Sequence, residues 1–144
     1  MDGIHKSFFI NATSDKVWQG LTEPQNLARW MCTSPEGACA DFNFVVGSTI
    51  VMSDPPSIPW DGEMIWRVVA VFEQSQVEYS FFHNLIGEET QLIFKLEEEG
   101  EGTRLQLLHS GFENTVGDVR KNRDAHDEGW KDHMTRLKGL CEGN

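Results

Sequence analysis

Basic residues are scarce in this chain of 144 residues, which carries 12 Lys and Arg against 23 Asp and Glu and a formal net charge of −11. Phosphate backbones are bound by clustered Lys and Arg, so this balance argues against a nucleic-acid-binding protein. Anionic membrane surfaces are also bound through basic clusters, and the composition argues against that partner as well. The excess of acid is typical of a chain kept soluble by self-repulsion, with a specific cationic partner as the alternative.

Long apolar runs and cysteine pairs are also missing. No apolar run approaches the roughly 18 residues that a membrane-crossing helix needs, and residues 1–6 lack the basic-then-apolar order of a signal peptide. The three cysteines, Cys32, Cys39 and Cys141, form no CxxC pair. We therefore expect free thiols in a cytoplasmic protein, with a Cys32–Cys39 disulfide as the alternative. The length predicts a single domain over residues 1–144.

Motifs for catalysis and metal binding are absent from the sequence. There is no P-loop, no G-x-G-x-x-G and no nucleophile-elbow pattern. Ser110, His109 and Asp118 supply the residue types of a hydrolytic triad, but nothing in the sequence places them in triad geometry. His126 and His133 fall on one helical face about 10 Å apart along the axis, too far to share a metal ion. We therefore predict no catalytic residues, no metal site and no cofactor.

Apolar residues that alternate with polar ones predict strands along most of the chain. The predicted strands cover residues 5–11, 41–46, 48–53, 62–73, 77–83, 91–97 and 103–110. Two short helices are predicted after the first strand, one from Ser14 to Leu21 with Ser14 as its cap, and one that begins at Pro24. Short turns between successive strands predict an antiparallel meander.

The longest predicted strand, residues 62–73, has one wholly apolar face that we assign to the core. The residues of this face are Met64, Trp66, Val68, Ala70 and Phe72. Two stretches are predicted to be loops. Residues 33–38 contain Pro35 and Gly37, and residues 54–59 contain three prolines that cannot donate to a β-ladder.

A long helix is predicted from Asn114 to Cys141, because Trp130, Met134, Leu137 and Cys141 recur at i, i+4, i+7 and i+11. One such helix, with roughly 25 residues and a length of about 37 Å at about 1.5 Å per residue, lies along a curved sheet without filling its whole concavity. The fold class is therefore α+β, with a sheet, a helix across it and a space between them. Spaces of this kind are the usual sites for small apolar molecules, and complete filling by aromatic side chains is the alternative.

Three segments of the sequence resemble a known family. They are Ile10-Asn11-Ala12 with Val17-Trp18, Leu21-Thr22, Pro24 and Trp30; Thr103 to Phe112; and Gly129-Trp130 with Met134, Leu137 and Lys138. Together they resemble the START-like, or SRPBCC, superfamily, and more narrowly the family named after the activator of the ATPase of the ninety-kilodalton heat-shock chaperone. The resemblance implies a single-domain helix-grip fold, in which a seven-stranded antiparallel sheet wraps around the long C-terminal helix, with a cavity between them. The proline-rich stretch 54–60 departs from the commoner pattern near the expected cavity mouth.

Aromatic, methionine and histidine side chains are the candidate lining of that cavity. The predicted lining residues are Trp30, Trp60, Met64, Trp66, Phe81, Phe94, Leu107, His109, His126, Trp130 and Met134. Among them, His109 and His126 are the predicted polar groups that orient a ligand. His83 also ends a strand and could point into the cavity, although a structural role is the alternative for every histidine.

Three functions are compatible with these expectations. The first is a small intracellular protein that binds an apolar or aromatic small molecule between sheet and helix. The second is a co-chaperone-like module, active in the stress response, whose acidic surface binds a basic patch on a chaperone. The third is a cyclase- or hydrolase-type enzyme that acts on a lipid-like or polyketide-like substrate. None of the three involves nucleic acid or a membrane.

Overall fold

The structure is a computed structural model that describes residues 3–33, 38–39 and 44–143. Its strands are β1 (Ile4–Ile10), β2 (Ala38–Cys39), β3 (Thr49–Ser53), β4 (Glu63–Phe72), β5 (Gln76–Phe82), β6 (Thr90–Glu99) and β7 (Gly102–Ser110). Its helices are α1 (Ser14–Thr22), α2 (Pro24–Met31), the short 3-10 helix η1 (Phe112–Asn114) and α3 (Val119–Cys141). None of the helices in the described part of the chain has the length and apolar character needed to cross a membrane.

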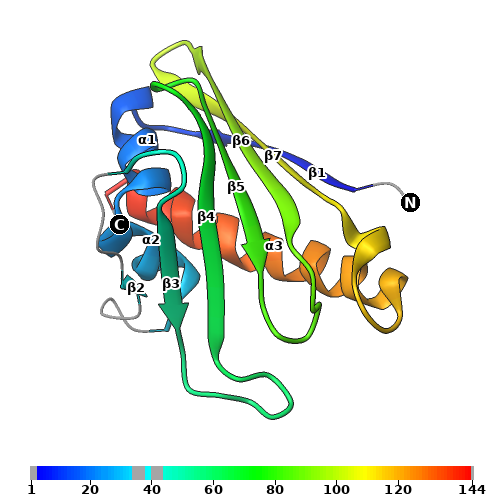
Figure 1. Cartoon of the computed structure of the whole chain (residues 1–144). Helices are drawn as coiled ribbons and strands as arrows, with labels where there is room; N and C mark the ends of the chain where they lie inside the picture. The colour runs from blue at the N-terminus through cyan, green and yellow to red at the C-terminus, as the bar shows by residue number, and fades with distance from the viewer. Residues whose placement is uncertain (1–2, 34–37, 40–43, 144) are drawn as a thin grey trace.

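The strands form one open antiparallel sheet in the order β1-β7-β6-β5-β4-β3-β2. Its body consists of strands five to ten residues long, and the two-residue β2 joins at the edge of β3. The strands from β3 to β7 pair with their neighbours in the chain, which confirms the predicted meander, and β1 closes onto β7. Figure 1 shows α3 lying across one face of this sheet, with α1 and α2 beside its C-terminal half. The α+β class and the C-terminal helix are therefore confirmed.

Helix α3 buries the predicted face and begins later than predicted. Its buried residues are Trp130, Met134, Leu137 and Cys141. The helix begins at Val119 rather than Asn114, because Gly117 has a φ of 80° and Asp118 then caps the helix. The Asp118 carboxylate accepts a hydrogen bond from the Lys121 backbone N–H at 3.2 Å, which satisfies one of the first free N–H groups of the helix.

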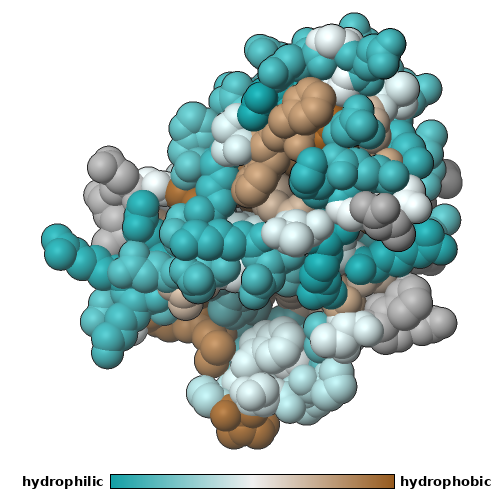
Figure 2. All heavy atoms as spheres, turned by 180° about the vertical axis from the view of Figure 1, so that it is seen from behind, coloured by the Kyte–Doolittle hydropathy of each residue, from teal (hydrophilic) through white to brown (hydrophobic). Residues whose placement is uncertain are grey.

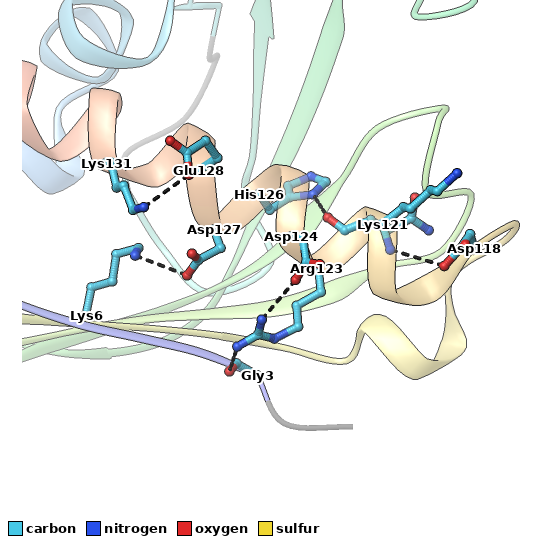
Figure 3. A network of polar contacts seen from close by, with 11 residues as sticks. Gly3, Lys6, Asp118, Lys121, Arg123, Asp124, His126, Asp127, Glu128 and Lys131 are labelled. Carbon is cyan, nitrogen blue, oxygen red and sulfur yellow. Dashed lines mark hydrogen bonds and ion pairs between the residues drawn. The ribbon is translucent and has the colours of Figure 1, made fainter.

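The N-terminal half of α3 is fastened to β1 by charged side chains. Lys6 of β1 pairs with Asp127 at 3.1 Å, and an Arg123 guanidinium nitrogen donates to the carbonyl of Gly3 at 3.4 Å. Figure 3 shows both contacts on the side of the helix that faces β1. They hold the segment that carries His126 against the sheet edge.

The predicted core face of β4 is wrong beyond Val68. The register to β5 shifts between Val68 and Ala70, so Val69 is an extra residue in the ladder. A bulge of this kind moves every later side chain to the opposite face. Val71 therefore packs against the core, whereas Phe72 is 55% exposed. The bulge depends on cross-strand pairing, which the alternation within one strand does not reveal.

The prediction for the stretch before β3 needs two corrections. Residues 34–37 of the expected loop 33–38 lie outside the described residues, and its last residue, Ala38, belongs to β2 and pairs with Met52 of β3. The expected strand 41–46 is not a strand over residues 44–46, where the chain bends and turns toward Gly47. Its first part, residues 41–43, lies outside the described residues. The short apolar run lies at a bend rather than in a β-ladder, and its Val45 and Val46 side chains are largely exposed.

Aromatic side chains fill the space between the sheet and the C-terminal half of α3. Trp30, Trp66, Phe94 and Trp130 pack with ring centroids 6.1 to 6.4 Å apart. The indole of Trp30 donates to the carbonyl of Gly20 at 2.8 Å. The indole nitrogen of Trp66 is buried and has no hydrogen-bond partner among the described residues. This packed cluster closes one end of the space between sheet and helix.

Candidate functional site

The other end of that space is an open cavity of about 470 Å³. It lies between α3, the ends of strands β4 and β5 and the loop that joins β3 to β4. Its lining residues are Met31, Asp54, Ser57, Trp60, Met64, Phe81, His83, Leu85, Ala125, His126, Gly129, Trp130 and His133. The volume falls within the roughly 300–1,000 Å³ of typical small-molecule sites, and the mixture of apolar walls with a few polar groups is also typical of them.

The structure divides the predicted lining residues into two groups. Trp60, Met64, Phe81, His126 and Trp130 line this cavity. The others, Trp30, Trp66, Phe94, Leu107, His109 and Met134, are buried in the packed core instead. They share the inward-facing side of the sheet and helix with the first group, but they lie where the aromatic cluster fills the space. Alternation in the sequence indicates which face is inward and does not indicate how far along the fold the packing is complete.

Sequence reasoning missed several lining residues on α3. Ala125, Gly129 and His133 line the cavity together with His126 and Trp130. These positions follow i, i+1, i+4, i+5 and i+8, so they form a second helical stripe beside the buried one. A helical projection of residues 125–133 would have found this stripe. The remaining missed residues are Met31 at the end of α2 and Asp54, Ser57 and Leu85 on loops. Periodicity does not identify lining residues at such positions.

The loop over the cavity mouth, residues 54–62, is held at both ends by hydrogen bonds. Asp54 accepts from the backbone and the hydroxyl of Thr33 at 2.8 and 2.7 Å. Asn84 donates to the carbonyl of Pro59 at 2.8 Å and accepts from the backbone of Asp61 at 3.1 Å. At Gly62 the φ is 87°, and a Cβ would lie 2.3 Å from the Asp54 carbonyl, so only glycine fits there. These contacts fix the backbone of the loop, and Trp60 lines the cavity from it.

His83 and His126 form a hydrogen-bonded pair in the cavity wall, with their Nε2 atoms 2.8 Å apart. The His126 Nδ1 faces the carbonyl of Asn122 at 2.6 Å, and a carbonyl only accepts, so this nitrogen carries a proton. The His83 Nδ1 accepts from the backbone N–H of Leu85 at 3.3 Å, so it carries none. In the neutral pair the His83 Nε2–H therefore donates to the His126 Nε2. All four ring nitrogens are engaged.

His109 is buried one layer deeper and is also fully hydrogen-bonded. The indole N–H of Trp130 donates to the His109 Nδ1 at 3.0 Å. The His109 Nε2 then carries the proton and donates to the Thr90 hydroxyl at 2.7 Å, which in turn donates to the carbonyl of Phe81 at 2.9 Å. His109 is therefore a structural link between α3 and the sheet, rather than a group that faces a ligand in the cavity.

His133 differs from the other three histidines, because one of its nitrogens is unused. Its Nδ1 lies 3.1 Å from the carbonyl of Trp30 and donates to it. The Nε2 of the neutral ring is then a hydrogen-bond acceptor. Within the described part of the chain, no protein donor bonds to this nitrogen, and His133 lines the cavity.

Burial keeps these histidines neutral near pH 7. It lowers the pKa of His83 to about 4, with a further contribution from the neighbouring His126. Burial also lowers the pKa of His126 and of His133, and it holds the pKa of His109 well below its ordinary value. The cavity wall contains no Lys or Arg, and Asp54 is its one acidic residue among those described. The electrostatic environment therefore disfavours an anionic ligand.

The described residues offer little to a metal ion or to nucleophilic chemistry. They contain no group of three or more His, Cys, Asp and Glu side chains with metal-binding geometry. Cys32 and Cys141 are free and buried, and burial raises the pKa of each thiol to about 11, so both are poor nucleophiles at neutral pH. The side chain of Cys39 lies outside the described residues.

The outer surface around α3 is mainly hydrophilic. Figure 2 views the molecule from this side and shows apolar atoms in separate areas rather than in one continuous patch. Ile58 and Leu85, on the loops that border the cavity, are 86% and 42% exposed. Part of the exposed apolar surface of the molecule therefore lies at the cavity mouth.

Comparisons with known proteins give a family and a fold. The family model described as "Activator of Hsp90 ATPase homolog 1-like protein" matches residues 11–142. No curated protein matches the chain at a significant level.

Several solved structures are similar over nearly the whole chain. The Aha1 dimer from Colwellia psychrerythraea is 22% identical, with a TM-score of 0.75 over 99% of this chain and 97% of that one. Protein MLL2253 from Mesorhizobium loti is 21% identical, with a TM-score of 0.74 over 96% and 95% of the two chains. DynU16, from the dynemicin biosynthetic locus, is 20% identical with a TM-score of 0.72, and this chain spans 46% of its length. At these identities the likeness shows a shared fold, consistent with the helix-grip arrangement.

Proposed function

The chain belongs to the family of activator of Hsp90 ATPase homolog 1-like proteins, and from that premise we propose that it binds a small, uncharged aromatic molecule in the cavity between α3 and the open end of the sheet. Family membership confirms the resemblance based on residues 103–112 and Gly129-Trp130. The ligand class itself is inferred from the cavity.

The composition of the cavity wall is the observation that carries this proposal. Trp60, Met64, Phe81 and Trp130 present flat or adaptable apolar surfaces around about 470 Å³ of space. An aromatic ligand buried against them would gain roughly 25 cal/mol for each Å² of apolar surface removed from water. The imidazole of His133, whose Nε2 has no protein donor in the described part of the chain, supplies a polar group of the kind that such sites use for orientation.

The fold supports a preformed site. The mouth loop is fastened through Asp54 and Asn84, and α3 is fastened to β1 through Lys6 and Asp127. A ligand therefore does not have to order the walls as it binds, which lowers the entropic cost of association.

A second candidate function is a protein-interaction module of the co-chaperone kind, supported by the family and by the charge of −11. The acidic residues Glu97, Glu98, Glu99 and Glu101 are exposed at the β6–β7 hairpin, at the end of the sheet beside α1 (Figure 1). Such a surface would bind a basic partner with strong salt dependence. A chaperone pull-down that persists at low salt and disappears at high salt would favour this candidate.

The enzyme alternative has less support in the described cavity. His109 has both nitrogens bonded within the core, and His83 and His126 use theirs on each other and on backbone groups. Neither arrangement leaves a free base beside a nucleophile.

A fluorescence titration tests the binding proposal. N-phenyl-1-naphthylamine is a neutral aromatic probe that brightens in apolar surroundings and accepts energy from tryptophan. We expect saturable binding of one probe per chain, with quenching of tryptophan emission, since Trp60 and Trp130 form part of the wall. A linear, unsaturable response at concentrations where the chain stays folded would refute the proposal.

A further inference from the structure

We propose that His133 Nε2 is the specificity-determining acceptor of the cavity, so that the site selects neutral ligands with a hydroxyl donor, of the phenol or naphthol class, over equally sized ethers and carboxylates. This inference rests on the proposed function, because it concerns the same cavity.

The tautomer of His133 is fixed by its anchor. The carbonyl of Trp30, in the last turn of α2, lies 3.1 Å from Nδ1 and can only accept, so the proton resides on Nδ1. The neutral ring then presents a lone pair at Nε2. Anchoring through a backbone carbonyl also fixes the orientation of the ring, so that Nε2 offers its lone pair to one donor geometry.

The other imidazole and indole nitrogens of the wall are already paired. The indole N–H groups of Trp130 and Trp60 donate to His109 and to the carbonyl of Glu63. The His83–His126 pair uses all four of its nitrogens. Among these nitrogens, a ligand donor that enters the cavity therefore finds Nε2 of His133 available without breaking an existing hydrogen bond.

Two further groups at the wall limit the choice of ligand. Asp54 carries the one formal charge among the described lining residues, and its Oδ1 already accepts two hydrogen bonds from Thr33. Ser57 is exposed on the mouth loop. A carboxylate ligand would meet the charge of Asp54 and the lone pair of His133, with no Lys or Arg among the described wall residues, and burial of an unpaired charge is costly. A hydroxyl-bearing neutral aromatic pairs with His133 and avoids this cost.

A matched ligand series tests the inference through displacement of N-phenyl-1-naphthylamine at neutral pH. 2-Naphthol, 2-methoxynaphthalene and 2-naphthoate share one ring system and differ in donor and charge. We expect 2-naphthol to bind roughly three- to tenfold more tightly than 2-methoxynaphthalene, the value of one net hydrogen bond, and 2-naphthoate to bind most weakly. Equal affinities for the naphthol and the ether would overturn the inference.

Variants then assign the preference to one residue. His133→Phe keeps a ring in place and should abolish the preference for naphthol over its ether, whereas His133→Gln retains an acceptor and should keep part of it. The comparison is made within each variant, so a general loss of stability cancels. If Asp54→Asn abolishes the preference and His133→Phe does not, the acceptor is Asp54 and the assignment to His133 fails. If the probe binds but the preference is absent, only this inference fails, whereas absence of probe binding refutes the proposed function.

Discussion

The indole N–H of Trp130 donates to Nδ1 of His109 over 3.0 Å, and this one contact joins the long helix to the sheet at the base of the cavity. It begins a chain of donors that continues through the His109 Nε2–H and the Thr90 hydroxyl to the carbonyl of Phe81. Phe81 and Trp130 are both cavity residues. The shape of the wall therefore depends on a buried polar link that lies behind it.

Substitutions at this link should be strongly coupled. His109→Leu leaves the Trp130 N–H and the Thr90 hydroxyl short of a partner, and Trp130→Phe leaves the His109 Nδ1 unpaired. Each should lower the free energy of unfolding by roughly 2–4 kcal/mol, since a buried unsatisfied polar group costs about 1–3 kcal/mol beyond lost packing. The double variant should cost about 1–2 kcal/mol less than the sum. Urea unfolding of all four proteins measures this, and strict additivity would contradict the assigned hydrogen bonds.

Two fully buried tryptophans offer a matched test of a hydrogen bond in the aromatic core. Trp30 donates to the carbonyl of Gly20, whereas the Trp66 indole nitrogen has no hydrogen-bond partner among the described residues. Replacement by Phe removes similar volume at both sites, but at Trp30 it also leaves a buried carbonyl without its donor. Trp30→Phe should therefore destabilise by about 1–2 kcal/mol more than Trp66→Phe. Equal losses in chemical denaturation would show that Trp66 also has a partner, such as a bound water.

The buried His109 and the partly buried His83, His126 and His133 predict a loss of stability on mild acidification. In the unfolded chain a histidine takes up a proton near pH 6.5, whereas burial lowers the pKa of His83 to about 4 and lowers the pKa of His109, His126 and His133 in the folded state. Between these limits the unfolded state binds more protons, so the free energy of unfolding falls as pH falls. Above about pH 7 the histidine contribution is constant.

The slope of this loss can be measured by denaturant unfolding at pH 7, 6 and 5. Each histidine that is neutral when folded and protonated when unfolded contributes up to about 1.4 kcal/mol per pH unit. His83→Gln removes one such group and should make the dependence shallower. A free energy of unfolding that stays flat from pH 7 to pH 5 would show that the histidines are accessible to protons in the folded state.

Much of the fold could be predicted from the sequence because its signals are local. The stripe from Trp130 to Cys141 and the alternation in the later strands follow directly from helical and strand periodicity. The bulge at Val69 could not be predicted, since it depends on how β4 pairs with β5. The helix start was predicted too early, at Asn114, because the residues before Asp118 carry no periodic signal that distinguishes a turn from a helix.

The site was predictable only in part, for a different physical reason. Periodicity identifies inward-facing side chains such as Trp66 and Phe81, but only the three-dimensional packing decides that the first is in the filled core and the second faces open space. The histidine roles were also hidden. His109 and His133 differ through the donors that reach them from distant elements, and a single sequence does not report those contacts.

Two glycines of α3 provide the most direct test of the central claim that the cavity binds an aromatic ligand. A Cβ added at Gly129 or at Gly139 meets no atom within 4 Å, and only Gly129 lines the cavity. Leucine at either site should favour the helix by somewhat under about 1 kcal/mol, so both variants should fold. Only the side chain in Gly129→Leu enters the cavity.

The measurement is the affinity of N-phenyl-1-naphthylamine for the two variants and the unaltered chain. Gly129→Leu should weaken binding about tenfold or more, equivalent to about 1.4 kcal/mol or more, whereas Gly139→Leu should bind the probe as the unaltered chain does. Equal affinity in all three proteins, with folding retained, would show that the probe binds elsewhere and would contradict the proposed site.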